Sequence, residues 1–416
     1  MTANGRPDRV AVTGIGVITP IGTGVRTFWD ALLAGKVGTR PLTRFDASEF
    51  ASRVAAQVDD FDPSDYLSPK RLRWTDRFAQ FAIAASRLAF EDANFSPEGC
   101  GDDVGVFVGS ALGGLAYAED QHDVFRAQGI KAVRPLVAIS VFGGAATTQV
   151  ALEFGLRGPN VSNGNSCAAG AVAIGEAFRS IARGDIRAAL AGGVEAPLAP
   201  LSFGAFSIIR SMSTRNDDPG RASRPFDRDR DGFVMAEGAG ILLLERLDDA
   251  LARNAHIYGE IAGFGLTGDA HHMTAPDPDG RSSARAMHAA LREAGVAPDE
   301  VELIDAHGSS SKLNDSTETL AIKRAFNGNA YGIPIVATKG QHGHALGATG
   351  AWEAAISLLA MSEGRLPGSV NLDNRDPECD LDCARDVRGG RARIALSNST
   401  GFGGINAALV MRSFEQ

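Results

Sequence analysis

Three residues with chemically active side chains stand where short apolar runs give way to helices. Cys167 follows the Gly-containing approach 162–166 and opens an expected helix over 167–183. A thiol at a helix N-terminus faces the positive end of the helix dipole and free backbone N–H groups, which favour the thiolate. The small residues 168–170 leave space around the sulfur. We therefore predict a nucleophile at Cys167, with a buried structural cysteine as the alternative.

Two histidines occupy comparable turns later in the chain. His307 ends the strand-like run 303–306, and His344 lies within 339–347, just before another expected helix. Strand-to-helix turns are where α/β sheets place functional groups. A lone histidine is more often structural, but two of them with a cysteine at a third turn favour a catalytic site, because the nucleophile then has acid–base or electrophilic partners. His342 is interpreted as incidental.

The elements that must position these residues alternate between strands and helices. Short apolar runs stop at glycines, as at Gly14 and Gly16, which indicates buried strands that meet tight turns. Strands are expected at 10–13, 104–108, 188–191, 240–245, 303–306 and 394–396, and helices at 27–34, 75–93, 167–183, 282–294, 316–326 and 351–363. This alternation predicts an α/β fold. A break near 247–258 suggests two pseudo-duplicated halves: 1–255 with the cysteine, and 256–416 with both histidines.

Composition excludes several classes of protein. The 416 residues are 44% hydrophobic and carry a net charge of −9, which gives no electrostatic footprint for nucleic acid. Four cysteines without a Cys-x-x-Cys pair make no disulfide framework and favour a reducing compartment. No targeting segment is visible, and the apolar runs are too short to span a membrane. We expect a soluble, cytoplasmic protein that binds neither nucleic acid nor membranes.

Several partial motifs are set aside. The segment 14–16 lacks the third glycine of a dinucleotide fingerprint, since Thr19 stands there. The segment 227–232 resembles a calcium loop but is interleaved with arginines, so a turn held by ion pairs is expected. The stretch 164–168 lacks the last glycine of a hydrolase elbow. Neither the Cys379/Cys383 pair nor His271-His272 completes a ligand set, so no metal is predicted.

Ordered motifs along nearly the whole chain carry a family resemblance. They are the segments 10–20, 155–159, 162–168, 213–216, 224–227, 231–233, 305–308, 314–315, 339–347 and 397–404. With them the chain resembles the elongating β-ketoacyl-[acyl-carrier-protein] synthases, within the thiolase-like condensing enzymes. The resemblance implies a layered αβαβα core. It also implies an acyltransferase that condenses a cysteine-bound acyl group with malonyl-carrier protein, releasing CO2, free carrier and a 3-oxoacyl-carrier.

The resemblance assigns roles residue by residue. Cys167 would be the acylated nucleophile, and His307 and His344 would hold the extender carbonyl and stabilise the enolate. Lys339 and Glu318 would form a supporting charged pair. The backbone N–H groups of Cys167 and Phe402 would form the oxyanion hole, and Phe402 and Phe233 would be gates. Thioester exchange needs a thiolate, and decarboxylation needs donors aimed at a developing oxyanion. A neutral histidine pair supplies those donors without a metal, and ping-pong kinetics are expected.

Substrate and partner sites follow from the same resemblance. Substrate-binding positions would be Leu112, His272, Ser309, Ser311 and Thr400, and the phosphopantetheine of the carrier would bring the substrates with no other cofactor. Lys70, Arg71, Arg73 and Arg210 would dock the acidic carrier, although a solvated charged helix end explains the first three equally well. The family further implies a dimer, either with a second copy or with a related ketosynthase-like subunit.

Departures from the fatty-acid pattern bear on the substrate. Ser309 and Ser311 stand where threonines are usual, Trp74 takes a usually basic position, and Asn165-Ser166 replaces a Thr-Ala pair. Thr400 replaces a phenylalanine, which removes apolar volume and adds a hydroxyl. We therefore predict a discrete type II polyketide ketosynthase for longer, unsaturated or more polar chains. The alternatives are a housekeeping fatty-acid elongation synthase and the active subunit of a ketosynthase/chain-length-factor heterodimer.

Four rival classes fit the residues less well. A chain-length factor would lack the Cys167 nucleophile, and a degradative thiolase would need a second cysteine near 401–404. An initiating synthase would pair its cysteine with one histidine and an asparagine, whereas His344 indicates the two-histidine type. A hydrolase would not need the Lys339 and Glu318 arrangement.

Overall fold

The computed structural model describes residues 8–414, and its centre is one continuous eleven-stranded sheet. The strand order is β11-β10-β14-β15-β9-β1-β8-β7-β5-β6, with β2 paired on β1. The N-terminal strands are β1 (Val10–Thr19), β2 (Gly22–Thr23), β5 (Val104–Gly109), β6 (Asn160–Asn163), β7 (Ala188–Glu195) and β8 (Gly238–Arg246). The C-terminal strands are β9 (Gly259–Gly268), β10 (Leu303–Asp305), β11 (Ile335–Val336), β14 (Ile394–Gly401) and β15 (Ile405–Arg412).

The strand pairing repeats on either side of the contact between β1 and β9. In the N-terminal half, β1–β8 and β8–β7 are antiparallel, and β7–β5 and β5–β6 are parallel. In the C-terminal half, β9–β15 and β15–β14 are antiparallel, and β14–β10 and β10–β11 are parallel. The predicted α/β fold with pseudo-duplicated halves is confirmed. Two small hairpin sheets, β3 (Thr39–Pro41) with β4 (Val54–Ala56) and β12 (Arg365–Leu366) with β13 (Arg388–Gly389), lie beside the main one.

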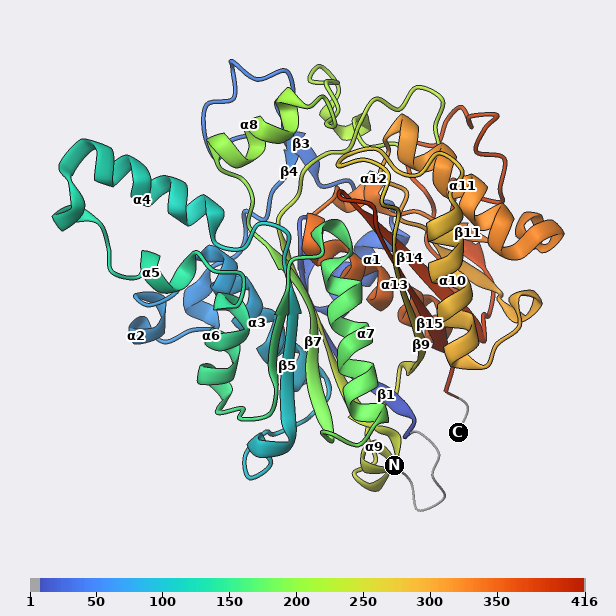
Figure 1. Ribbon diagram of the computed structural model, residues 1–416, viewed down its shortest axis with the longest axis horizontal. Coiled ribbons are helices and arrows are strands. Elements are labelled where there is room, and N and C mark those ends of the chain that lie inside the picture. The colour runs from blue at the N-terminus through green and yellow to red at the C-terminus, as the bar shows by residue number, and fades with distance from the viewer. Residues whose placement is uncertain (1–7, 415–416) are drawn as a thin grey trace.

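Helices form three layers around the sheet (Figure 1). Buried side chains of α7 and α13 share one apolar cluster with strands of both halves, so these two helices form the middle layer. Helices α3 and α6 cover the outer face of the N-terminal strands, and α10 and α11 cover that of the C-terminal strands. The helices are α1 (Val25–Leu33), α2 (Pro69–Leu72), α3 (Arg77–Asp92), α4 (Leu115–Gln128), α5 (Val137–Ser140), α6 (Ala145–Phe154), α7 (Ala169–Ala182), α8 (Pro200–Ile208), α9 (Leu247–Ala252), α10 (Arg281–Ala294), α11 (Lys312–Phe326), α12 (Lys339–His342) and α13 (Thr349–Glu363).

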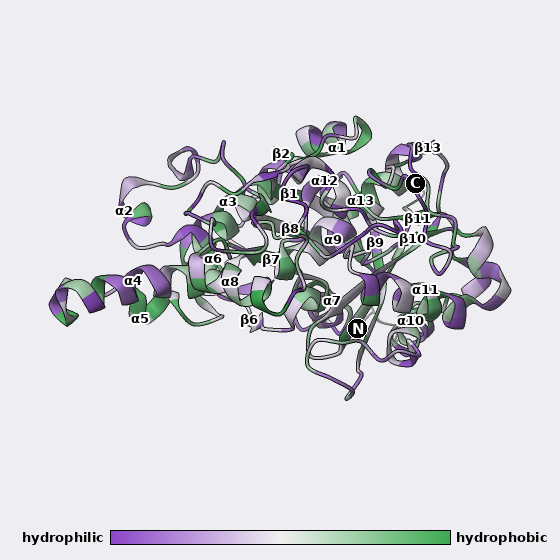
Figure 2. Ribbon diagram, turned by 90° about the horizontal axis from the view of Figure 1, so that it is seen from above, coloured by the Kyte–Doolittle hydropathy of each residue, from purple (hydrophilic) through white to green (hydrophobic). Residues whose placement is uncertain are grey.

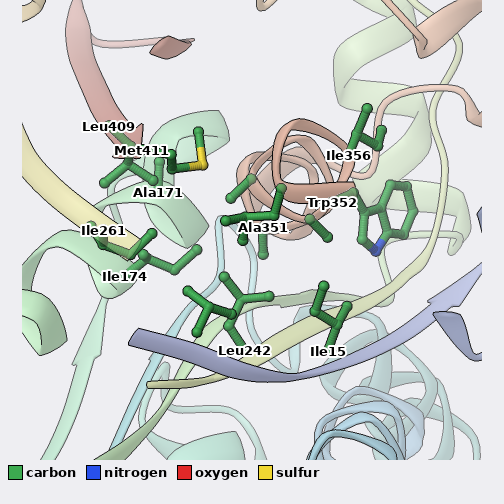
Figure 3. Close-up of a cluster of buried hydrophobic side chains, with 14 of the residues drawn as sticks. Ile15, Ala171, Ile174, Leu242, Ile261, Ala351, Trp352, Ile356, Leu409 and Met411 are labelled. Carbon is green, nitrogen blue, oxygen red and sulfur yellow. The ribbon is translucent and has the colours of Figure 1, made fainter. Parts of the chain in front are cut away.

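The middle layer is apolar on all sides because strands face it from both halves. Figure 3 shows Ile174 of α7 beside Ile261, and Ala351 of α13 above Leu242. Trp352, fully buried, donates its indole N–H to the carbonyl of Ala239 at 2.8 Å. The burial of such side chains stabilises the fold by about 1.5–3 kcal/mol each. The outer helices α3 and α10 are amphipathic, with buried residues on one face and exposed residues on the other, and in Figure 2 α11 also carries both hydrophilic and hydrophobic stretches.

The six helices expected from the sequence are all present, with ends shifted by at most a few residues. Three longer helices, α4, α6 and α8, were not predicted. Helix α4 buries only Gln121 among its described residues, so it offers no apolar stripe that periodicity detects. In Figure 1 it projects from the body of the protein together with α5.

The expected tight turn at Gly14 and Gly16 is wrong, because β1 continues through both glycines to Thr19. Their role is close packing of the strand against α3. A Cβ on Gly16 would lie 1.9 Å from the carbonyl oxygen of Ala85. In the other half, a Cβ on Gly265 would lie 1.9 Å from the carbonyl oxygen of Ala286 in α10. Glycine inside a strand thus marks a close backbone approach in both halves.

The segment 227–232 is a turn held by buried ion pairs, as predicted. Arg230 is 1% exposed and lies 2.6 Å from Asp376 and 3.5 Å from Asp315. Within residues 8–414, no group of three or more His, Cys, Asp and Glu side chains is arranged to hold a metal ion. Over the same residues, no helix is both long and apolar enough to cross a bilayer.

Candidate active site

The predicted nucleophile and both predicted histidines line one cavity of about 330 Å³. Cys167 comes from the N-terminal half, and His307 and His344 come from the C-terminal half, so the cavity forms where the halves meet. Its other walls are Phe206, Ile209–Ser211, Asp231–Phe233, Asp269, Thr274–Pro276, Ser309, Ser311–Asn314, Leu346, Thr400–Phe402, Gly404 and Asn406.

Cys167 lies in a short 3₁₀ turn, Ser166–Ala168, that runs directly into α7. Ser166 has a left-handed backbone with φ of 51°, which re-aims the chain just before the nucleophile. The β14–β15 turn approaches it so closely that a Cβ on Gly401 would lie 3.1 Å from the Cys167 nitrogen. Because of this approach, the Phe402 backbone N–H reaches the sulfur.

The expected thiolate is not the resting form of Cys167. Burial raises the pKa of its thiol to about 11, and the charge of Glu195 acts in the same direction. The Ser166 hydroxyl, whose oxygen is 3.8 Å from the sulfur, the Lys339 charge and the Phe402 N–H oppose this rise. Desolvation of the buried sulfur thus outweighs its position at a helix N-terminus. The thiol is neutral until a substrate arrives, and its proton must leave during attack.

His307 follows β10, and its backbone is held from two sides. Its N–H donates to Glu318 Oε1 at 2.7 Å, and its carbonyl accepts a hydrogen bond from Lys339 Nζ. Its Nδ1 is buried and has no hydrogen-bond partner among the described residues. A fixed backbone with one unsatisfied ring nitrogen indicates a site prepared for a further polar group.

His344 faces His307 across the cavity. The two ring centroids are 5.1 Å apart in an edge-to-face arrangement, and His344 Nδ1 lies 3.0 Å from the Thr349 hydroxyl. Burial, followed by the nearby Lys339 charge, lowers the pKa of both imidazoles well below the ordinary value. Both rings are therefore neutral at physiological pH, and each carries one N–H that can donate to an oxyanion.

Lys339 and Glu318, predicted to support the histidine region as a charged pair, both contact the His307 backbone but do not pair with each other. Lys339 pairs with Glu353 of α13, and both side chains are 1% exposed. Glu318 instead accepts the N–H groups of His307 and Gly308 and the amide of Asn398, at 2.6–2.8 Å. Backbone donors occupy the Glu318 carboxylate because it sits beside the start of the turn, whereas Lys339 lies on the opposite side near α13. The two residues still hold His307, but separately.

Glu353, Asn398 and Thr349 complete this support and were not predicted. A signal existed for Glu353, since a carboxylate stands among the apolar residues 351–361 of a helix that is buried all round. Thr349 lies five residues after His344, too far for a local motif to reveal the contact. Asn398 lies in the motif 397–404, which gave it no role of its own.

Three phenylalanines form one side of the cavity. Phe206 stacks on Phe402 with centroids 6.0 Å apart and meets Phe233 edge-on at 5.9 Å. Phe233 in turn meets His344 edge-on at 5.4 Å. The two gate residues predicted from the sequence thus line the cavity, and Phe206 connects them.

The predicted substrate residues divide into two groups. Ser309, Ser311 and Thr400 line the cavity. The Ser309 and Ser311 hydroxyls are 2.9 Å apart, and the Thr400 hydroxyl donates to Asn314 Oδ1 at 2.8 Å. Because the Thr400 hydroxyl proton is used in this hydrogen bond, the hydroxyl can only accept a hydrogen bond from a substrate.

Leu112 and His272 do not line the cavity. Leu112 packs against the apolar cluster that contains Cys167, Phe233 and Leu346. His272 is exposed, and its Nδ1 accepts the backbone N–H groups of Thr274 and Ala275. It therefore shapes the loop whose residues 274–276 form part of the wall.

The four predicted docking residues do not form one patch within a single chain. Arg210 is exposed at the end of α8 and lines the cavity. Lys70 and Arg73 are exposed at α2, whereas Arg71 pairs with Glu153 at 2.7 Å. Figure 1 places α2 and α8 on different parts of the molecule. The pairing of Arg71 also reduces the positive charge available at α2.

Family models and curated proteins match nearly all of this chain. The model described as "Beta-ketoacyl synthase, N-terminal domain" matches residues 7–250, and "Beta-ketoacyl synthase, C-terminal domain" matches 258–373. A 3-oxoacyl-[acyl-carrier-protein] synthase 2 of Synechocystis sp. is 45% identical over 99% of this chain and 100% of its own length. The protein of the same name from Coxiella burnetii is 44% identical over 97% and 98%.

Solved structures show the same similarity in three dimensions. A type II PKS ketosynthase solved with its acyl-carrier protein, AntDE:AntF, has a TM-score of 0.91 and 35% identity. The ishigamide ketosynthase/chain length factor has a TM-score of 0.92 and 36% identity. Each comparison covers 98% of this chain and 100% of the other.

Proposed function

The chain belongs to the beta-ketoacyl synthase family, acyltransferases that condense an acyl group with malonyl-carrier protein, and on that premise we propose the residues that perform each step. Cys167 carries the acyl group, and His307 and His344 act on the extender. The observation that carries this proposal is the shared cavity, which brings one thiol and two neutral imidazoles together from different halves.

The first step transfers the acyl group to Cys167. Its sulfur attacks the thioester carbonyl of the acyl-carrier, a new C–S bond forms, and the bond to the carrier sulfur breaks. The thiol proton ends on the departing carrier thiol, with the neutral imidazoles at the same cavity available to relay it. The backbone N–H groups of Cys167 and Phe402 hold the transient oxyanion. One such donor is worth about 2.7–4 kcal/mol.

The second step forms the new carbon–carbon bond. The N–H donors of His307 and His344 bind the malonyl thioester carbonyl, so when CO2 leaves, its electron pair moves into an enolate that these donors stabilise. The enolate carbon attacks the Cys167 thioester, the C–S bond breaks, and the released thiolate takes a proton. Lys339 and Glu318 are positioning residues, because they hold His307 through its backbone.

The partner of this reaction is an acyl carrier protein whose phosphopantetheine presents both substrates. Arg210 stands at the cavity and is the docking residue best placed for an acidic carrier. Lys70, Arg71 and Arg73 contribute only if a bound carrier or a second subunit brings α2 into reach. We further propose a cytoplasmic enzyme that works as a homodimer or with a related ketosynthase-like subunit. Its halves would divide at 255/256.

For the pathway, we propose a discrete type II polyketide ketosynthase. Thr400 gives the cavity wall a small polar residue, and its hydrogen bond to Asn314 places a hydroxyl and an amide group side by side on that wall. Of two similar solved structures, one is a type II PKS ketosynthase bound to a hexaketide and the other is a ketosynthase/chain length factor. Housekeeping fatty-acid elongation remains the second candidate, since the curated relatives named above carry the name 3-oxoacyl-[acyl-carrier-protein] synthase 2.

A substrate panel tests the pathway. Turnover is measured with saturated, polyene and 3-oxo acyl-carriers of equal length, with Thr400→Phe as the matched variant. We expect the wild type to favour polyene or 3-oxo chains and Thr400→Phe to shift that preference toward saturated chains. An equal or greater preference of the wild type for saturated chains would assign it to fatty-acid elongation.

A further inference from the structure

A buried carboxylate next to the cavity takes no part in the steps above. Glu195 is the last residue of β7, is 0% exposed and does not line the cavity. Its charge acts on the Cys167 thiol, so it lies close to the nucleophile. A buried carboxylate is costly unless hydrogen bonds compensate it, so its partners indicate its purpose.

Glu195 accepts four hydrogen bonds from two separate segments. Oε1 accepts the Ser110 hydroxyl at 2.9 Å and the Leu112 N–H at 3.0 Å. Oε2 accepts the Ala111 N–H at 2.7 Å and the Gly347 N–H at 2.9 Å. A carboxylate that accepts two donors on each oxygen is matched as an ion, whereas an amide of the same shape would set its own NH2 against two of those donors.

The two segments serve different parts of the site. Residues 110–112 follow β5, and the side chains of Ala111 and Leu112 pack against the apolar cluster that contains Cys167. Gly347 belongs to the 3₁₀ turn Leu346–Ala348, which begins two residues after His344 and leads into α13. Glu195 is thus the direct link between the apolar wall beside the nucleophile and the turn that carries His344.

The junction has no spare room. A Cβ on Gly347 would lie 2.7 Å from the Ala111 nitrogen and 2.8 Å from Glu195 Oε2. Leu346, the residue before it, has a left-handed backbone with φ of 44° and packs into the same apolar cluster. A backbone held in this conformation requires support from its surroundings, and Glu195 provides it.

We propose that Glu195 is a positioning residue that sets the distance between Ala111–Leu112, which pack against the apolar cluster beside Cys167, and the His344 turn, and so determines how a Cys167-bound chain is aligned for condensation. This inference rests on the proposed function of Cys167 and His344. An acyl chain long enough to extend from Cys167 into this apolar cluster depends on the link, whereas an acetyl group does not. Misalignment of the chain costs kcat and leaves malonyl-carrier binding intact.

The test compares Glu195→Gln with Glu245→Gln, a matched control. Glu245 is also a buried glutamate, in the neighbouring strand β8, and pairs with Arg253 away from the cavity. Condensation kinetics are measured with acetyl and with long acyl chains on Cys167. For Glu195→Gln we expect kcat with the long chain to fall about tenfold, a smaller loss with acetyl, and a KM for malonyl-carrier within about twofold of wild type.

The control and a second variant make the outcomes decisive. Gly347→Ala strains the same junction from the other side and is expected to reproduce the chain-length effect, and it decides the question if Glu195→Gln does not fold. Equal losses across chain lengths, or the same profile in Glu195→Gln and Glu245→Gln, would overturn the inference. An inactive wild type would instead refute the proposed function, so the two failures are distinguishable.

Discussion

The two halves of the molecule share one backbone plan and carry different chemistry. Each half leads into its central helix through a 3₁₀ turn that contains a left-handed residue, Ser166 before α7 and Leu346 before α13. In the first half the turn presents the Cys167 thiol. In the second, the position that matches Cys167 is Gly347, and His344 lies two residues before the turn. The same turn therefore presents a nucleophile in one half, whereas in the other the functional side chain stands just outside it.

The electrostatic surroundings of the two halves differ. Close to the nucleophile, the groups that act on Cys167 are mainly neutral hydroxyl and N–H donors, with Glu195 and Lys339 as the charges. The C-terminal half buries several charged side chains close together. They are the pair Lys339 and Glu353, Glu318 beside His307, and Asp305, whose pKa is raised by burial. Burial, followed by the Lys339 charge, lowers the pKa of both imidazoles and keeps the rings neutral. The charged groups of the C-terminal half thus surround the histidines, whereas the nucleophile has mainly neutral neighbours.

Contact between the central helices joins these two functions. A Cβ on Gly170 of α7 would lie 2.7 Å from the carbonyl oxygen of Gly347, and one on Gly350 of α13 would lie 3.0 Å from the nitrogen of Ala171. Each helix start thus approaches the other through a glycine. The site is formed by this contact and belongs to neither half alone.

The largest effect is expected from removal of the Cys167 thiol, the reactive group of the first half. Cys167→Ala leaves no group to carry the acyl chain, so condensation falls to background, a loss of about 10⁴-fold or more. Product formation from acyl- and malonyl-carrier measures this loss. Cys100→Ala, at a partly exposed cysteine of the same half, is the control and keeps wild-type turnover. Residual ping-pong turnover by Cys167→Ala would contradict the assignment of the nucleophile.

Removal of a histidine attacks the second half alone. His307→Ala or His344→Ala each deletes one donor to the enolate, so release of CO2 from malonyl-carrier slows by about 10²–10³-fold. Acyl transfer to Cys167 is expected to continue in both variants, and His256→Ala, at an exposed histidine, serves as the control. If acylation and CO2 release were lost in parallel, the division of labour between the halves would be wrong.

The glycine contacts test whether the halves are equivalent as structures. Gly16→Ala and Gly265→Ala each push a methyl against a helix backbone at the same depth, so each should lower the free energy of unfolding by about 1–3 kcal/mol. Gly328→Ala, at an exposed position with open space, should change it by less than about 0.5 kcal/mol. Denaturant unfolding gives all three values. A large difference between Gly16→Ala and Gly265→Ala would break the structural equivalence.

The smallest expected effect concerns the Lys339 charge, which adds to burial in lowering the pKa of the histidines. Because the pKa of each imidazole lies well below about 6.5, CO2 release by the wild type should not fall as pH drops through that value. Lys339→Met removes a positive charge that lowers the pKa of both rings, which favours the imidazolium. The acid limb of the rate profile should therefore move up by about one pH unit. An unchanged limb, or one moved to lower pH, would contradict this account.

Much of the fold was predictable because local signals agreed with the tertiary structure. Helices such as α3 and α13 are long and have extensive apolar faces, and the turns at Cys167 and His307 follow recognisable strand ends. The expected strand-to-helix turn at His344 is instead preceded by the short helix α12. The turn predicted at Gly14 and Gly16 was wrong, because a glycine that makes room for a neighbouring backbone looks the same in sequence as one that bends the chain. The close approach of α3 is a long-range contact that no local pattern records.

The support of the site was less predictable than its reactive groups. The partner of Lys339 was assigned to Glu318 although Glu353 lies on the helix that packs beside it, a choice that depends on three-dimensional placement. The prediction of a thiolate at Cys167 was wrong for a related reason. The sequence shows that Cys167 stands at a helix N-terminus, but it does not show how deeply the sulfur is buried. His272 likewise proved to hold its own loop together.

Peptide mapping of the acylated protein tests the central claim most directly. The protein is incubated with an acyl-carrier, digested and analysed by mass spectrometry, before and after addition of malonyl-carrier. The account predicts an acyl group on the Cys167 peptide alone, discharged with release of CO2 once malonyl-carrier is added. Acylation at Cys100, Cys379 or Cys383, or a Cys167 thioester that malonyl-carrier does not discharge, would contradict it.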